Sequence, residues 1–337
     1  MDSKVDVSII VCAYNAASTI DRCLNSLLAQ KTSASFKIIV VNDGSTDDTK
    51  EHLDQFNQNE KILLINKKNT GASDSRNIAL TRVHSTYVTF VDSDDYVDTD
   101  YLETLYDQYE KYPDIDLAIS GYQKEEQNGQ IIMKAQGNSS IMSRRETLKL
   151  IFASYIIEGY LVNKLFKMSI INRQNLKFEA TISIAEDLDF CCRYLRYINK
   201  SSYIPRPTYH YIMYENSQLN SIKIGKTFSG NNTNLVKTLI KIKNDIIEDY
   251  PEVNSAINAR LCWAATVVLR SIYAAPNKND VNQSIINNMW SICGKYQKDF
   301  LKNDILPMKD KLVYFINKIS PMGLAILWKT FKLRRGK

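Results

Sequence analysis

Three carboxylates follow directly after an apolar segment of this sequence. Residues 88–91 read Val-Thr-Phe-Val, which is typical of a buried strand, and Asp92, Asp94 and Asp95 come next. Several negative charges at the end of a buried strand repel one another unless a cation lies among them. Divalent cations such as Mg²⁺ prefer oxygen ligands and often bridge to a phosphorylated substrate. The segment therefore predicts a divalent-cation site.

Two other polar clusters also follow predicted strands. Residues 13–15 (Ala-Tyr-Asn) come after the apolar run 7–12, and residues 43–45 (Asp-Gly-Ser) come after the run 37–41. Over the first 120 residues such runs alternate with helical patterns, which predicts a mostly parallel sheet. Because ligands of open α/β sheets bind at the carboxyl ends of the strands, we expect the three clusters to form one site.

Several well-known motifs are absent from the sequence. An EF-hand loop starting at Asp92 would need a ligand at Tyr96 and a glycine at Val97. There is no Walker A loop, GxGxxG, HExxH or GxSxG segment, and three histidines leave few candidates for a histidine-based triad. These absences argue against P-loop, dinucleotide-binding, zinc-protease and serine-hydrolase functions.

Composition indicates a folded protein of one large domain with an appendage, or of two domains. The chain has 337 residues, of which 44% are hydrophobic and 24% charged. Its six cysteines form no CxxC pair, which favours reduced, buried thiols. The sequence enters a strand almost at once, and no apolar run approaches the ~20 residues that span a bilayer. We therefore expect no signal peptide and a cytoplasmic location.

Charge and turn signals suggest a division of the chain. Residues 1–230 carry 26 Lys+Arg and 29 Asp+Glu, whereas residues 231–337 carry 17 and 8. The polar segment 229–234 is our linker candidate, so we predict an α/β domain at 1–228 and a helical region at 229–337. Two local signals complete this prediction. Ser45 is expected to cap a helix, and Asn128-Gly129 is expected to form a tight hairpin.

Four segments together resemble the family 2 glycosyltransferases of GT-A fold, of the type that builds bacterial surface polysaccharides. They are residues 7–15, 40–47, 71–77 and 90–95, and their order and spacing match as well. The resemblance covers about residues 5–220. It implies an α/β fold with a mixed, mostly parallel sheet flanked by helices, followed here by a helical carboxyl-terminal region.

The resemblance implies a role for each matching residue on the donor side. Tyr14 would stack on the nucleotide base, and Asp43 would accept a hydrogen bond from the base or the ribose. Asp92 would face the ribose or the metal, and Asp94 would ligate Mn²⁺ or Mg²⁺ at the diphosphate. The residues implied in nucleotide-sugar binding are Ala13, Tyr14, Asn15, Asp43, Arg76, Asp92 and Ser93.

The resemblance also implies residues on the acceptor side. Asp187 would be the catalytic base, while Glu186 would orient its neighbours or be the base itself. Lys164, in the segment Val-Asn-Lys-Leu-Phe, would contact phosphate or the acceptor. His210, in Tyr-His-Tyr, would be a further metal ligand or an acceptor contact.

Most of these residues have a structural interpretation too. Asp43 would then stabilise the Gly44 turn, and Arg76 would pair with a nearby carboxylate. Tyr14 would cover the sheet edge and His210 would pack among tyrosines. The Glu186-Asp187 pair would place negative charge in the first turn of a helix, where the helix dipole favours it.

The expected function is inverting, metal-dependent transfer of a single sugar from a nucleotide sugar, most simply a UDP-sugar. The acceptor would be a glycan, lipid-linked, in capsule or exopolysaccharide assembly. No Gln-x-x-Arg-Trp motif follows Asp187, which favours single addition over processive synthesis. Alternatives are a non-catalytic nucleotide-sugar-binding or scaffolding protein, and a nucleotidyltransferase, whose glycine-rich, arginine-containing loop is missing.

The carboxyl-terminal segment 307–337 combines eight Lys+Arg with one acidic residue and many apolar residues. An amphipathic segment rich in basic residues suits a peripheral position on an anionic membrane. Its structural alternative is a terminal helix packed on its own domain. No nucleic-acid partner is expected because no motif supports one. A homo-oligomer formed through the helical region is a further possible partner.

Overall fold

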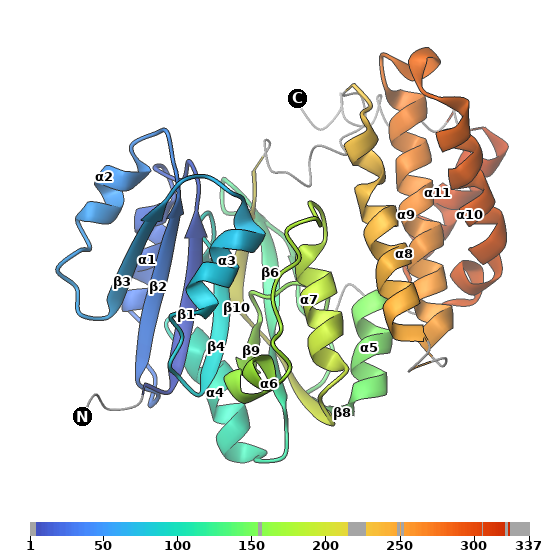
Figure 1. The fold of residues 1–337 in the computed structure, drawn as a ribbon. Coiled ribbons are helices and arrows are strands. Elements are labelled where there is room, and N and C mark those ends of the chain that lie inside the picture. Colours follow the sequence, from blue (N-terminus) through green and yellow to red (C-terminus); the bar gives the residue numbers. More distant parts are fainter. Residues whose placement is uncertain are drawn as a thin grey trace. The chain divides into compact units, whose positions relative to one another are not determined.

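The computed structural model describes residues 5–153, 157–214, 227–247, 250, 253–304, 306–320 and 323. The chain forms two compact units, drawn in Figure 1. The first comprises Met1–Thr147, Gly159–Thr181 and Glu186–Tyr214, and the second comprises Leu148–Glu158, Ile182–Ala185 and Glu215–Lys337. The main boundary lies at 214/215, whereas the sequence predicted 228/229, and two short internal segments also belong to the second unit.

The first unit is built on one mixed sheet with the strand order β3-β2-β1-β4-β9-β6-β10-β5, in which β7 pairs with β6 and β8 with β10. The strands are β1 (Val7–Ala13), β2 (Phe36–Asp43), β3 (Ile62–Lys67), β4 (Tyr87–Asp92), β5 (Tyr96–Val97), β6 (Leu117–Glu126), β7 (Ile131–Lys134), β8 (Ser140–Ser143), β9 (Lys164–Lys167) and β10 (Lys200–Met213).

Strand direction and register bring the predicted polar clusters to one edge. Strands β1, β2, β3 and β4 are parallel neighbours, and β6 is parallel to β10. Ala13 is level with Asn42, Asp43 with Lys67, and Cys12 with Asp92. The expected mixed, mostly parallel sheet flanked by helices is therefore confirmed, with β9 as an antiparallel strand between β4 and β6.

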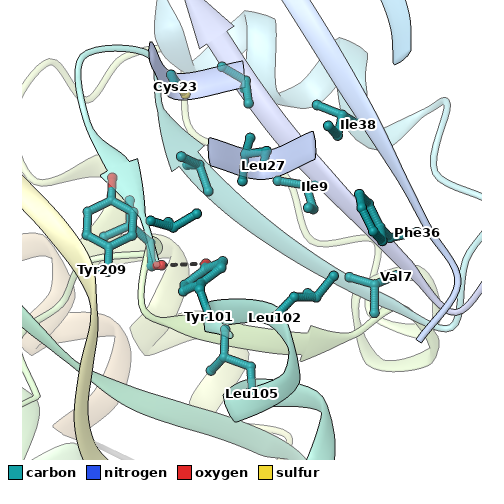
Figure 2. Close-up of a cluster of buried hydrophobic side chains, with 14 of the residues drawn as sticks. Val7, Ile9, Cys23, Leu27, Phe36, Ile38, Tyr101, Leu102, Leu105 and Tyr209 are labelled. Carbon is teal, nitrogen blue, oxygen red and sulfur yellow. Dashed lines mark hydrogen bonds between the residues drawn. The ribbon is translucent and has the colours of Figure 1, made fainter. Parts of the chain in front are cut away.

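Within the described residues, six helices belong wholly to this unit: α1 (Ile20–Leu28), α2 (Thr49–Asp54), α3 (Ala72–Leu80), α4 (Tyr101–Lys111), α6 (Met168–Arg173) and α7 (Glu186–Leu195). Helix α5 (Arg144–Ala153) begins in the first unit and continues into the second. Side chains alternate across a strand, so the continuous apolar runs of the central strands place apolar side chains on both faces of the sheet. Both faces must therefore be packed against other elements. Figure 2 shows α1 and α4 on one face, where their side chains meet β1 and β2 (Cys23, Leu27, Tyr101, Leu102, Leu105; Val7, Ile9, Phe36, Ile38).

An aromatic cluster lies on the other face of the sheet, near the end of β4. Phe90 of β4 packs edge-on against Phe178, with the ring centroids 5.6 Å apart. Phe178 in turn stacks on Phe190 of α7 at 4.2 Å. Aromatic pairs of this kind contribute beyond the area they bury. The cluster fixes the start of α7 relative to the end of β4.

Two local expectations had different outcomes. The hairpin at Asn128-Gly129 is confirmed, since β6 and β7 pair antiparallel around it and Gly129 has φ of 85°. The prediction that Ser45 caps a helix is wrong. Helix α2 begins at Thr49 with Asp48 before it, and the Ser45 hydroxyl instead donates to Asn42 Oδ1. Ser45 thus stabilises the strand end rather than the helix.

The second unit is helical where the structure describes it. Its elements are η2 (Gly230–Thr233), α8 (Asn234–Ile247), α9 (Asn254–Ala274), η4 (Lys278–Asp280), α10 (Gln283–Lys302) and α11 (Met308–Ile319). The linker candidate, 229–234, forms η2 with a capping box at Ser229 and leads straight into α8. Searched over the described residues, the chain has no helix that is long and apolar enough to cross a bilayer.

The buried hydroxyl of Tyr101 offers a test of this packing. It lies 2.8 Å from Thr89 Oγ1 and donates to the carbonyl of Val162 at 2.7 Å. Tyr101→Phe leaves both partners buried and unpaired, so we expect unfolding free energy to fall by about 1–3 kcal/mol in denaturant titration. Tyr112→Phe, at the other end of the same helix, is the matched control, and an equal loss there would contradict the assignment.

Candidate active site

The loop after β1 is locked to the loop after β2. Asn15, which has φ of 51°, accepts a hydrogen bond from Thr46 N at 2.8 Å, and its own amide donates to Ser45 Oγ at 3.1 Å. Ala13 is buried in β1, whereas Tyr14 keeps half of its surface exposed. An exposed ring on a fixed loop suits stacking of a planar ligand.

Asp43 anchors the loop between β3 and α3. Its Oδ1 pairs with Lys67 Nζ and accepts from Thr70 N at 2.9 Å, and its Oδ2 accepts from Gly71 N at 2.9 Å. Burial opposes ionisation of Asp43, but these hydrogen bonds outweigh it and lower the pKa of the carboxyl. Gly44 beside it has φ of 67°, and a Cβ there would lie 2.6 Å from Asn69 N, so only glycine fits.

The three carboxylates at the end of β4 and in the turn after it have different surroundings. Asp95 is buried and accepts hydrogen bonds from the Tyr209 hydroxyl at 2.6 Å and from Ile212 N at 2.7 Å. It therefore ties the turn to β10. The carbonyl of Asp94 accepts from Arg22 Nη2 at 2.6 Å and from the Tyr214 hydroxyl at 3.2 Å. The backbone of the turn is thus fixed around half-buried Ser93.

The side chains of Asp92 and Asp94 have the chemistry of a cation site. Burial, followed by the charge of Asp92, raises the pKa of Asp94 to about 6. Burial also raises the pKa of Asp92, against the opposing charge of Arg76. Asp94 has no ion-pair partner among the described residues. Two carboxylates held near one another at such a cost fit a hard divalent ion such as Mn²⁺ or Mg²⁺.

Among the residues that the structure describes, no third protein ligand completes this site. In the described part of the chain, no group of three or more His, Cys, Asp or Glu side chains is placed to hold a metal ion. The candidate site therefore offers Asp94 and Asp92, and the remaining ligands would come from a bound phosphate and water, as is common for Mg²⁺.

Arg76 of α3 joins the end of β4 to the start of α7. Its Nη1 lies 2.9 Å from Glu186 Oε1 and 3.0 Å from Asp187 Oδ1, and its Nη2 lies 3.6 Å from Asp92 Oδ1. The guanidinium is buried and lies over the ring of Phe178 at 5.4 Å. The structural interpretation of Arg76, an ion pair with nearby carboxylates, is what the geometry shows.

Asp187 has the properties of a poised base. Burial raises its pKa to about 7; Arg76 opposes this effect, while Glu186 and Asp92 add to it. Asp187 Oδ1 is buried and has no hydrogen-bond donor in good geometry, despite its ion-pair neighbour. A carboxylate with a pKa near neutrality can accept a proton at physiological pH. Its position in the first turn of α7 also suits its negative charge.

Lys164, expected to contact phosphate or acceptor, is fully buried in β9. Its ammonium donates to the carbonyl of Tyr160 at 2.6 Å and to Asn163 Oδ1 at 2.9 Å. Its charge lowers the pKa of Asp187. The burial of Asp187, which raises this pKa, and the charge of Arg76, which lowers it, both have larger effects. Contact with a ligand would require these hydrogen bonds to break, so the geometry favours an indirect, electrostatic contribution.

His210, expected as a metal ligand or acceptor contact, lies in a separate polar network. Its Nδ1 is 2.7 Å from Glu125 Oε1, its Nε2 is 3.0 Å from Asp98 Oδ1, and its ring stacks on Tyr96 at 4.1 Å. Both ring nitrogens therefore lie within hydrogen-bond distance of carboxylates. This geometry favours the structural interpretation of His210, and its role as a metal ligand or acceptor contact stays a prediction.

The structure thus gathers Asp92, Asp94, Arg76 and the Glu186-Asp187 pair, and places the Tyr14 and Asp43 loops along the same sheet edge. Sequence reasoning missed Lys67, although it ends the third strand at that edge and could have been found there. It also missed Arg22 and Phe178, for which the sequence holds no signal, since one lies within a helix and the other in a loop.

Comparison with known proteins identifies the family of this domain. Residues 8–174 match the family described as glycosyl transferase family 2. The chain contains a family 2 glycosyltransferase domain. The matched residues include the β1, β2 and β4 ends and Arg76, while the Glu186-Asp187 pair lies just beyond them.

Two relatives illustrate the extent of the sequence likeness. Glycosyltransferase GlyA of Streptococcus pneumoniae is 42% identical over 123 residues, which is 36% of this chain and 17% of GlyA. The teichoic acid poly(glycerol phosphate) polymerase of Staphylococcus epidermidis is 29% identical over 199 residues, 58% of this chain and 26% of the polymerase. The chain thus covers well under two thirds of either relative.

Solved structures show the same fold. S. aureus TarS 1-349 in complex with UDP-GlcNAc has a TM-score of 0.63 at 17% identity, covering 87% of this chain and 92% of that one. The mannosyltransferase PcManGT of Pyrobaculum calidifontis, in complex with GDP-Man and Mn²⁺, has a TM-score of 0.54 at 13% identity, covering 95% and 88%. The GT-A fold of this glycosyltransferase domain is therefore shown.

The raised pKa of the Asp94 carboxyl leads to a prediction about the pH dependence of stability. Its folded-state pKa of about 6 lies above the ordinary value of 3.8, so its ionisation destabilises the fold as pH rises through that range. Asp94→Asn should therefore raise unfolding free energy by about 1–3 kcal/mol at about pH 8 and have little effect near pH 4. Denaturant titrations at both pH values measure this.

A matched control separates this effect from the loss of any negative charge. Asp107→Asn, on the exposed side of α4, removes a carboxylate remote from the turn. The assignment of Asp94 fails if its substitution destabilises the protein at the higher pH, or if Asp107→Asn stabilises it equally.

Proposed function

We propose that this protein transfers a single sugar from a nucleotide sugar, most simply a UDP-sugar, to a glycan hydroxyl with inversion at the anomeric carbon. One observation carries the proposal: buried Arg76 brings the donor-side Asp92 and the acceptor-side Asp187 to the same guanidinium. A displacement reaction needs a leaving-group site and a base close together, and this set of ion pairs supports such an arrangement.

The donor site would follow the sheet edge from β2 to β4. Tyr14 would stack on the base, Asn15 and Ala13 would shape its loop, and Asp43 would hold the loop at Thr70 and Gly71 or accept from the base. Asp92 and Ser93 would face the ribose. The UDP-GlcNAc bound by TarS, which shares the fold, supports a uridine-linked donor.

Asp187 would act as the general base. It removes the proton from the acceptor hydroxyl while that oxygen bonds to the anomeric carbon and the bond from that carbon to the nucleoside diphosphate breaks. The proton ends on Asp187, and the electron pair leaves with the diphosphate. A single displacement inverts the anomeric configuration. Arg76 keeps Asp187 and Glu186 oriented and opposes the protonation of Asp187.

Asp94, with Asp92, would hold a divalent cation at the diphosphate. Such an ion, when bound, stabilises the negative charge that develops on the departing diphosphate. The Mn²⁺ in PcManGT supports this assignment, as does the raised pKa of Asp94.

The acceptor is proposed to be a lipid-linked glycan of a surface polysaccharide or teichoic acid. The likeness to a teichoic acid polymerase supports this class of product, and the basic carboxyl-terminal segment supports a location on the inner face of the membrane. The last residues of that segment, 324–337, lie outside the described part of the chain.

Substitution of the proposed base tests the reaction. Asp187→Asn keeps the size of the side chain but cannot accept the proton, so transfer should fall by about 10²–10⁴-fold. Binding of UDP with Mn²⁺, measured by calorimetry, should stay close to that of the unaltered protein because Asp187 lies on the acceptor side. Transfer is measured as UDP release and product formation.

Glu186→Gln is the matched variant for this experiment. If Glu186→Gln abolishes transfer while Asp187→Asn leaves it, the base is Glu186. If neither variant changes turnover, the proposed mechanism is wrong. If UDP does not bind at all, the nucleotide-sugar proposal itself fails.

The charge of Arg76 should be visible in the pH dependence of transfer. Asp187 must be ionised to act, so the rate should fall as pH drops through about 7. Arg76→Met removes the largest effect that opposes protonation, so the acid limb of kcat against pH should move up by roughly one to three pH units. Arg76→Lys keeps the charge and should move it less. A lower rate with an unmoved limb would show a purely structural role.

A further inference from the structure

Helix α11 exposes a continuous apolar face. Met308, Leu312, Phe315 and Ile319 are exposed by 75%, 60%, 45% and 84%. Their spacing of four, three and four residues places all of them on one side of the helix. Large apolar side chains that are this exposed and this regularly spaced mark a contact surface rather than chance exposure. We call these four residues the α11 stripe.

The other side of α11 packs within the helical unit. Tyr314 and Asn317 are buried. The Tyr314 hydroxyl donates to Gln297 Oε1 of α10 at 3.1 Å, and its ring lies 5.4 Å from that of Phe300. The orientation of the helix is therefore fixed by this packing, and the α11 stripe faces away from its own unit.

Lysines border the α11 stripe on both sides. At 100° per residue, Lys311 and Lys318 lie along one flank and Lys309 lies along the other. The ammonium of Lys318 also donates to Gln297 Oε1 at 3.2 Å. Asp310, the single acidic residue of α11, falls on the side of buried Asn317, opposite the stripe. The surface is thus an apolar strip between two basic margins.

We propose that the α11 stripe docks on an anionic lipid surface, with the helix lying in the plane of the interface. The four apolar side chains would enter the acyl boundary while the lysines reach the lipid phosphates. A helix of 12 residues is about 18 Å long, too short for a hydrocarbon core of about 30 Å.

The charges beside the α11 stripe favour an anionic lipid surface over a second copy of the chain. Two α11 stripes placed face to face would bring lysine margins together, which repels. An anionic bilayer satisfies the apolar strip and both margins at once. The docking does not depend on the proposed sugar transfer, although a lipid-linked acceptor would then lie in the surface on which the protein sits.

Vesicle binding by the full chain tests this proposal. Sedimentation with vesicles of phosphatidylcholine containing ~30% phosphatidylglycerol measures the partition coefficient. Leu312→Ser/Phe315→Ser should lower it at least tenfold, because burial of each side chain is lost. Met308→Ser/Ile319→Ser, at the helix ends, should act likewise and serves if the first variant is unstable. Ile240→Ser, an exposed apolar residue of α8, is the control and should change nothing.

Substitution of the lysines in the basic margins tests their contribution to vesicle binding. Lys309→Gln/Lys311→Gln/Lys318→Gln should lower binding to the anionic vesicles by up to about fivefold per lysine. It should leave binding to pure phosphatidylcholine unchanged, and added salt should reproduce its effect on the unaltered protein.

Two results would overturn the proposal. One is an unchanged partition coefficient for both serine variants with normal melting temperatures. The other is a dimer that dissociates on Leu312→Ser/Phe315→Ser while no form binds vesicles, which would assign the α11 stripe to a second copy. Asp187→Asn should bind vesicles normally, so failure of the sugar-transfer proposal would be distinguishable.

Discussion

A buried guanidinium pairs with three carboxylates that come from two distant parts of the chain. Arg76 balances one of the charges of Asp92, Glu186 and Asp187, so the cluster is short of positive charge if all three are ionised. Burying unbalanced charge is costly, and the raised pKa values of Asp92, Asp94 and Asp187 express that cost. A cation bound with a diphosphate would relieve it on the donor side, leaving Asp187 to accept a proton.

The scaffold accounts for the precision of this cluster. Strand register sets Asp92 level with Cys12, and the aromatic contacts of Phe178 with Phe90 and Phe190 set the start of α7 against β4. Asp95 fixes the intervening turn to β10 through Tyr209 and Ile212. The carboxylates that we propose as metal ligands and as base are therefore held by packing that has no part in the proposed chemistry.

Sequence reasoning predicted the strands and their polar ends because apolar runs and turn residues are local signals. It predicted from the strand ends that Asp43, Asp92 and Asp94 share one site, and it added the Glu186-Asp187 pair only through the family resemblance. It could not find the partners of Arg76, because Glu186 is 110 residues away in sequence. It predicted that Lys164 and His210 contact a ligand. It could not foresee that both side chains are buried and hydrogen-bonded within the protein, because those neighbours come together only in the folded chain.

The most direct test of the account is a crystal structure of the full chain with UDP and Mn²⁺. The account predicts the uracil against Tyr14, the metal on Asp94, and Asp187 still paired with Arg76 on the far side of the diphosphate. A nucleotide bound away from the β1, β2 and β4 ends, or a metal that does not touch Asp94, would contradict it.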